Sequence, residues 1–200
     1  LEIIKVMRDR ENICNYLDIP LQHGSSEILK LMRRGITREK TDALIKDIRD
    51  INPEISIRTT LIAGHPGEKD THFKEMYDFV ERNRFDRLGV FTYSHEEGTH
   101  SHSFEDDVPE ILKRKRYNQI MSLQQSISED LNKKKVGKSF KVLIDRGDKN
   151  NYFGRTEFDS PEVDNEVIIP AKDFHLRVGE FYDVKIISAS EYDLIGEVIK

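Results

Sequence analysis

One stretch of the chain decides the fold: Ile55-Ser56-Ile57-Arg58-Thr59-Thr60-Leu61-Ile62-Ala63-Gly64-His65-Pro66-Gly67-Glu68. Apolar and β-branched residues fill most of residues 55–63, a pattern that predicts a buried parallel strand. The two glycines that follow let the backbone turn sharply and let a ligand come close. The strand therefore ends in a segment that is built like a ligand site.

Arg58 is the only charged residue inside this predicted strand. Burying an isolated charge is costly, so an arginine here must be paired, hydrogen-bonded or turned toward a polar cavity. Arg58 is therefore a candidate for binding a carboxylate. His65 and Glu68 are open to two interpretations, since the turn also serves as a helix entry, where Glu68 would favour the positive helix start.

Length and composition set the outer limits. A chain of 200 residues can form one large domain, or a medium domain with a small one. The single cysteine, Cys14, excludes internal disulfides and cysteine-clustered metal sites within this chain, and we interpret it as a small buried residue. No apolar run approaches the roughly 20 residues that span a bilayer, and no signal peptide is visible, so we expect a cytoplasmic location and no membrane partner.

Segments like the one around Arg58 recur along the first half of the chain. Strand-like stretches at 16–21, 55–63 and 88–93 alternate with amphipathic helices, which predicts parallel strands joined by crossover helices in a barrel or doubly wound sheet. The helix after the first strand is expected to begin near Ser25 or Ser26 and to end at Gly35, and Thr37 is expected to cap the next helix. Because the chain opens inside a helix-like pattern without an initiator methionine, we expect part of the protein to lie upstream.

The pattern changes in the second half. A long helix is expected over residues 108–135, with the lysine-arginine run at 113–116 on its solvated face. From Val136 the hydrophobic period becomes two. Five short strands are predicted, which together indicate a small antiparallel barrel of the OB-like kind in residues 136–200: 140–144, 152–157, 166–170, 181–188 and 193–199.

Polar residues follow the predicted strands at their carboxyl ends. Gln22 and His23 end the first strand, and Tyr93 and Ser94 end the third. The carboxyl ends of parallel strands are where such folds place their sites, so we expect these residues to converge with Arg58. His23 is equally well explained by a hydrogen bond in the following turn. The histidines in the loop at 95–102 lack the spacing of a zinc protease, which favours a solvated loop and no metal site.

Several ordered motifs resemble one enzyme family. Residues 16–23 (YLDIPLQH), 29–34 (LKLMRR), 58–68 (RTTLIAGHPGE) and 85–94 (FDRLGVFTYS) resemble the radical S-adenosylmethionine (SAM) methylthiotransferases. The tail from about Val136 is similar to their TRAM domain. The resemblance implies that residues 1–107 are the carboxyl-terminal part of a TIM-type radical SAM barrel, that 108–135 form a closing helix, and that 136–200 are the TRAM domain.

The resemblance also implies cofactors and site residues. In such enzymes a [4Fe-4S] cluster held by three cysteines reduces SAM to a deoxyadenosyl radical, and a second cluster takes part in sulfur transfer. Neither cysteine set lies in this chain, so no catalytic or metal-ligating residue is expected in it and the fragment alone is expected to be inactive. The resemblance places six residues around SAM, with Arg58 on its carboxylate: Gln22, His23, Arg58, Gly64, Tyr93 and Ser94.

Two branches of the family differ in substrate. The strings at 89–94 (GVFTYS), 96–99 (EEGT), 154–156 (GRT) and 159–164 (DSPEVD) resemble the RimO branch, which modifies an aspartate of small-subunit ribosomal protein twelve. The other branch modifies an adenosine of tRNA. In the tail the resemblance makes three residues candidates for substrate recognition: Arg155, Asp159 and Asp164.

The charge of the tail distinguishes these substrates. Residues 136–200 hold nine Lys and Arg against thirteen Asp and Glu, a net charge of −4 out of −5 for the whole chain. RNA binding depends on cations that meet phosphates, whereas an acidic tail suits a basic ribosomal protein. The tRNA relative remains the alternative substrate class, and a non-catalytic RNA- or ribosome-binding module is the third hypothesis.

Overall fold

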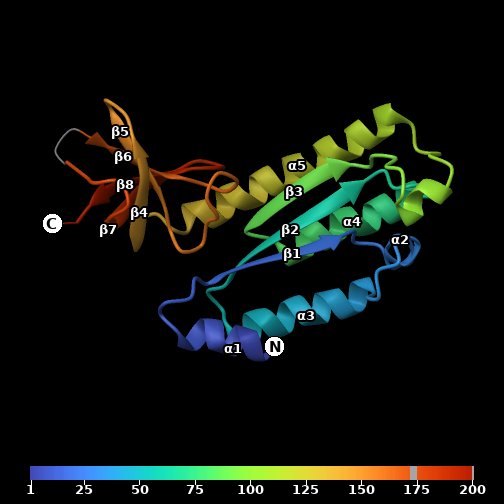
Figure 1. Cartoon of the computed structure of the whole chain (residues 1–200), viewed down its shortest axis with the longest axis horizontal. Helices are drawn as coiled ribbons and strands as arrows, with labels where there is room; N and C mark the ends of the chain where they lie inside the picture. Colours follow the sequence, from blue (N-terminus) through green and yellow to red (C-terminus); the bar gives the residue numbers. More distant parts are fainter. Residues whose placement is uncertain (172–174, 200) are drawn as a thin grey trace. The chain divides into compact units, whose positions relative to one another are not determined.

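The computed structural model describes residues 1–171 and 175–199. Its first sheet has three strands in the order β1 (Tyr16–Gln22), β2 (Ser56–Ala63), β3 (Arg87–Thr92). β2 and β3 pair in parallel, and Figure 1 shows β1 pointing the same way. The prediction of parallel strands joined by helices is confirmed.

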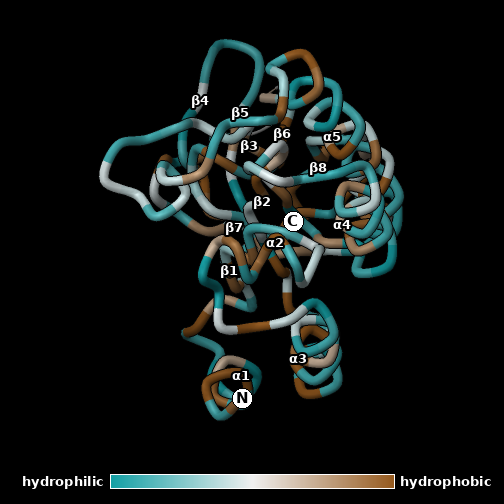
Figure 2. Tube along the Cα trace, turned by 90° about the vertical axis from the view of Figure 1, so that its right-hand side faces the viewer, coloured by the Kyte–Doolittle hydropathy of each residue, from teal (hydrophilic) through white to brown (hydrophobic). Residues whose placement is uncertain are grey.

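Helices cover one face of this sheet: Figure 2 shows α3, α4 and α5 on the same side of it, with α1 beside α3. No helix among the described residues is long and apolar enough to cross a membrane. The helical segments are α1 (Glu2–Asp9), α2 (Ser26–Leu31), α3 (Arg38–Ile51), α4 (Asp70–Asn83), the short 3₁₀ helix η1 (His100–Ser103) and α5 (Glu110–Lys133).

The two faces of β2 differ sharply in burial. Ile57, Thr59 and Leu61 are fully buried on the face that the helices cover. Arg58, Thr60 and Ile62 alternate with them and are only half-buried, as the period-two geometry of a strand requires. On the neighbouring β3, Phe91 leaves 64 % of its surface exposed. One face of the sheet therefore forms the core, and the other presents side chains that are open to a ligand.

The helix ends follow local chemistry. Thr37 caps α3 as predicted, with its side chain accepting a hydrogen bond from the Lys40 amide. α2 ends at Leu31, so the predicted end at Gly35 is wrong. Arg33 adopts a left-handed conformation (φ 56°) and ends the helix early, with the Arg34 amide donating to the Leu29 carbonyl at 2.8 Å.

The second half of the chain forms a closed barrel with the strand order β4-β5-β6-β8-β7. Its interior is filled by fully buried aliphatic side chains such as Val142, Ile144 and Ile186. The strands are β4 (Ser139–Gly147), β5 (Asn151–Arg155), β6 (Val167–Pro170), β7 (Phe181–Ala189) and β8 (Leu194–Val198). The five predicted strands and the small barrel are confirmed.

One feature of the barrel differs from the prediction of purely antiparallel strands. β6 and β8 pair in parallel, with Val167 beside Leu194, while the other four pairings are antiparallel. A closed barrel of five strands must contain at least one parallel pair of neighbours, because an odd number of strands cannot alternate in direction all the way round.

The described chain divides into two compact units. One contains Leu1–Asp9 and Leu17–Gln124, and the other contains Arg10–Tyr16 and Gln125–Lys200. The division therefore falls inside α5. Cys14 lies in the short segment that joins the second unit and is exposed, so its interpretation as a buried residue is wrong.

Candidate functional site

A cavity of about 520 Å³ lies at the carboxyl end of the three-stranded sheet. Gln22 ends β1, Thr60 and Ile62 come from the open face of β2, and Tyr93 and Ser94 follow β3. Three of the residues expected to converge, Gln22, Tyr93 and Ser94, thus line one cavity. Its volume is within the range of small-molecule sites.

Gln22 is held in a strained conformation at this cavity. Its φ of 74° is unusual for a residue with a side chain, and the His23 amide donates across it to the Leu21 carbonyl at 2.9 Å. This is a tight three-residue turn of the rare, strained kind. Strain of this sort costs about 1–3 kcal/mol and persists where the surrounding structure holds it, often at ligand sites.

Tyr93 forms a largely buried wall of the cavity. The Lys113 ammonium lies 5.2 Å from the centre of its ring, and its hydroxyl lies 3.1 Å from His95 Nδ1. Burial, together with the carboxylates of Asp106 and Glu96, raises the pKa of the Tyr93 phenol. The group is therefore a neutral hydroxyl that can orient a polar ligand without adding charge.

His65 is a lining residue that sequence reasoning left open. Its Nδ1 donates to the Pro66 carbonyl at 2.9 Å, and its Nε2 lies 2.8 Å from the Ser101 hydroxyl. Burial lowers the pKa of the His65 imidazole. The ring is therefore neutral, and its Nε2 accepts a hydrogen bond from Ser101.

The charged groups of the cavity are few. Glu96 accepts a hydrogen bond from the Ser94 hydroxyl at 2.5 Å. Arg34, just beyond the end of α2, is the only lysine or arginine among the described residues that line the cavity. Arg34 belongs to the motif at 29–34, but its place at the cavity could not be predicted, because it depends on where α2 ends.

Arg58 does not line this cavity. It lies on the same open face as Thr60, two positions earlier in β2, and its Nη1 donates to Asp18 on β1 at 2.6 Å. The expectation that Arg58 binds a carboxylate is thus met within the chain by an aspartate. Its side chain is 23 % exposed, so it remains accessible from the open face.

His23 lies behind the cavity rather than in its wall. Its Nδ1 accepts from the Ser25 amide at 2.9 Å, which leaves the proton on Nε2 to donate to Glu68 at 3.1 Å. The side chains of His23 and Glu68 are both fully buried. These contacts agree with the interpretation of His23 as a residue that stabilises the following turn.

Gly64 contacts the same buried carboxylate, that of Glu68. Its amide donates to Glu68 Oε2 at 2.8 Å, and its φ is +80°. A Cβ atom on Gly64 would lie 2.3 Å from Lys113 Cγ, so only glycine fits here. Gly64 therefore shapes the turn and does not line the cavity.

The interpretation of the run at 113–116 as a solvated helix face is wrong for two of its members. Lys113 and Arg116 are 3 % and 2 % exposed, because they lie three residues apart on the face of α5 that packs against the first unit. Lys113 donates to Asp106 at 2.7 Å, and Arg116 donates to the Glu68 carbonyl at 3.0 Å. Only Arg114 and Lys115 are exposed.

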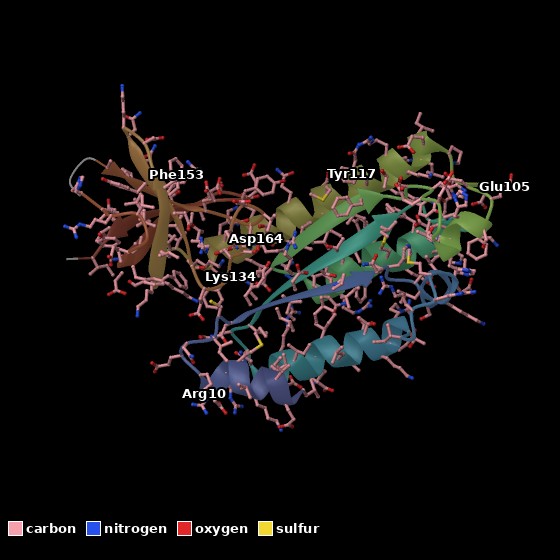
Figure 3. The ribbon with its side chains drawn as sticks, viewed as in Figure 1. Arg10, Glu105, Tyr117, Lys134, Phe153 and Asp164 are labelled. Carbon is pink, nitrogen blue, oxygen red and sulfur yellow. The ribbon has the colours of Figure 1, made fainter. Side chains whose placement is uncertain are left out.

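The barrel unit has an acidic cavity of about 300 Å³. Arg155 and Asp164, two of the expected recognition residues, line it; Asp164, labelled in Figure 3, lies in the loop between β5 and β6. Asp159 does not line it, since this residue is buried and accepts a hydrogen bond from Thr156 at 2.7 Å. The other carboxylates of the cavity are Asp145, Glu162, Glu166 and Asp193.

No three His, Cys, Asp or Glu side chains within residues 1–171 and 175–199 form a group that could hold a metal ion. The loop histidines interact as rings instead, with His95 and His102 at 4.2 Å between centroids.

Comparison with known proteins agrees with this architecture. Residues 1–80 match the radical SAM superfamily, and residues 136–199 match the TRAM domain. The chain is 58 % identical, over all of its 200 residues, to the ribosomal protein uS12 methylthiotransferase RimO of Cytophaga hutchinsonii. It is 49 % identical to the proteins of the same name from Bacteroides fragilis and Chlorobaculum tepidum, over 99 % of its length. It spans 46 % of the length of each of these relatives.

Together, the βα sheet with its cavity and the small closed barrel define the class, a radical SAM segment followed by a TRAM domain. Within that class, the chain is similar in its motifs and over its whole length to the RimO type of radical SAM methylthiotransferases.

Proposed function

We propose that this chain is the later barrel and substrate-recognition part of an enzyme that methylthiolates an aspartate of ribosomal protein uS12. The observation that carries the proposal is the identity of about half or more of its residues to proteins named as uS12 methylthiotransferases. Since the chain covers about half of those relatives, catalysis is assigned to the full-length protein, acting in the cytoplasm.

The cavity fits SAM as a ligand. It has apolar walls from Ile62 and Phe91, which suit an adenine ring, and polar groups from Gln22 and Ser94, which suit hydroxyl and amino acid groups. When bound, SAM would supply the radical chemistry of the family. The residues of this chain would bind and orient it and would exclude water on one side.

An iron–sulfur cluster does not fit the residues of this chain. Such clusters are held by several cysteine thiolates, and the chain has one cysteine, which is exposed. We therefore assign the two [4Fe-4S] clusters of the family to the remainder of the protein and derive no step through them.

The acidic cavity of the barrel suits a basic protein partner. Five carboxylates line it with one arginine, Arg155, which is already paired with Asp145. Of the carboxylates, Glu166 is also paired, with Arg146. The surplus negative charge would repel the phosphates of tRNA and attract lysine and arginine side chains of uS12.

The substrate class can be tested with the full-length protein after reconstitution of its clusters. Given SAM, a reductant and a sulfide source, we expect the mass of uS12 to rise by one methylthio group at an aspartate, with no methylthiolated nucleoside in tRNA digests. Modification of tRNA alone would assign the chain to the other branch. If an enzyme with intact clusters modifies neither substrate, the result would favour the third hypothesis, a non-catalytic binding module.

Arg58 provides a test of the cofactor site. We propose that in the full-length protein its guanidinium leaves Asp18 to bind the SAM carboxylate. Arg58→Ala should then weaken SAM binding by about 10- to 100-fold, the usual range for one charge-assisted contact. Equilibrium dialysis measures this directly. Arg82→Ala, which removes an exposed arginine paired with Asp42, is the matched control, and equal SAM affinity in both variants would remove Arg58 from the site.

A further inference from the structure

Arg34 stands out among the residues that no expectation assigned. It lines the cavity at the carboxyl end of the sheet as the only lysine or arginine among the described lining residues. Its guanidinium makes no hydrogen bond or ion pair with any described residue, in contrast to Arg58 and Arg116. An unpaired guanidinium beside apolar walls is ready to bind an anion.

The backbone at Arg34 is fixed rather than loose. The Arg33 amide donates to the Lys30 carbonyl at 3.0 Å, and the Arg34 amide donates to the Leu29 carbonyl at 2.8 Å. These two bonds form the Schellman termination of α2, with Arg33 in the left-handed position. Arg34 is therefore placed at the cavity by the way the helix ends, while Arg33 beside it does not line the cavity.

The other polar groups of the cavity restrict where an anion can bind. Glu96 brings a negative charge on the Ser94 side, and His65 and Tyr93 are neutral, so neither of them attracts an anion. An anionic group on a ligand is thus directed toward Arg34. A planar guanidinium matches a carboxylate in two parallel hydrogen bonds.

We infer that Arg34 is the carboxylate-binding residue of this cavity. This inference rests on the proposed function, which supplies two carboxylates, one on SAM and one on the target aspartate of uS12. Arg34 is exposed, so a protein substrate can reach it from solvent, and this favours the aspartate. Arg34 would then hold the target side chain in place while the reaction proceeds beside it.

The test is a double-mutant cycle with full-length protein and uS12. Dissociation constants are measured by fluorescence anisotropy for wild-type enzyme and Arg34→Gln, each with native uS12 and with uS12 whose target aspartate is asparagine. Arg34→Gln should weaken binding of native uS12 by about 10- to 100-fold and leave binding of the asparagine variant unchanged. Arg33→Gln, which removes the same charge one residue away, should match the wild type, and Arg34→Lys should restore part of the affinity.

SAM affinity is measured in parallel by equilibrium dialysis. A fall in SAM affinity with unchanged uS12 binding would identify the carboxylate as that of the cofactor. If Arg34→Gln and Arg33→Gln behave alike for both ligands, the inference is overturned. Should wild-type enzyme fail to bind uS12 at all, the proposed function fails, while the SAM measurement still decides whether Arg34 binds a carboxylate.

Discussion

Replacing Glu68 by glutamine is expected to lower the free energy of unfolding by about 3 kcal/mol, because the change leaves Arg116 buried without its main counter-charge. The Glu68 side chain is fully buried, and its Oε1 lies 3.0 Å from Arg116 Nη1. Among the residues that the structure describes, Arg116 keeps only Asp70 as an acidic partner, at 2.8 Å, and that carboxylate is 92 % exposed and screened by solvent.

The same substitution disturbs two further contacts. Glu68 Oε2 accepts hydrogen bonds from the Gly64 amide and from His23 Nε2, both of which are donors. The amide group of glutamine has one acceptor oxygen, so it cannot satisfy both these donors and Arg116. The turn that follows β2 should therefore loosen along with the helix that follows it.

Urea denaturation of the purified chain, followed by far-UV circular dichroism, measures the decrease in the free energy of unfolding. Hydrogen exchange at the β2 amides shows whether this decrease arises in the first unit. Glu27→Gln is the matched control, since the Glu27 carboxylate is 80 % exposed and accepts a hydrogen bond from His72 at 2.8 Å. We expect that control to change stability by about 0.5 kcal/mol or less. Equal effects of the two substitutions on the free energy of unfolding would show that the buried contacts of Glu68 stabilise the fold no more than an exposed carboxylate does.

The first unit shows how far the sequence can carry a prediction. The run of apolar and β-branched residues around Arg58 was enough to predict β2, because such a run bounded by glycines is typical of a buried parallel strand. The convergence of Gln22 and Tyr93 followed from topology alone, since parallel strands end at one edge of a sheet.

What the sequence could not provide are contacts that depend on tertiary packing. Arg116 and Glu68 are separated by 48 residues, and nothing local indicates that a charged position on a long helix is buried against a distant carboxylate. Arg58 was correctly expected to need a partner, but the choice of Asp18 depends on the pairing of β1 with β2. Arg34 reached the cavity only because Arg33, rather than Gly35, ends the helix.

The two units differ in what determines them. In the first, polar groups at strand ends create a cavity whose charge is almost balanced. Arg34, the one lysine or arginine among its described lining residues, determines where an anionic group can bind. In the second, the fully buried core residues of the barrel are aliphatic. The polar chemistry lies on the surface, where carboxylates surround Arg155 and where Arg146 lies 3.7 Å from the centre of the Phe153 ring, labelled in Figure 3. Changes to the barrel interior should therefore test folding rather than ligand binding.

Gly154→Ala is expected to destabilise the barrel by about 3 kcal/mol or more. Gly154 is buried in β5, paired with Ile144 on one side and Val167 on the other. A Cβ atom there would lie 2.4 Å from the Leu143 carbonyl oxygen, and because that neighbour is backbone, β4 and β5 would have to separate. Gly35→Ala controls for the unfolded-state effect of losing a glycine, since its Cβ would meet nothing within 4 Å. Hydrogen exchange across β4 and β5 should rise strongly in Gly154→Ala and stay unchanged in the control, and full protection in both would show that the barrel absorbs the extra methyl group.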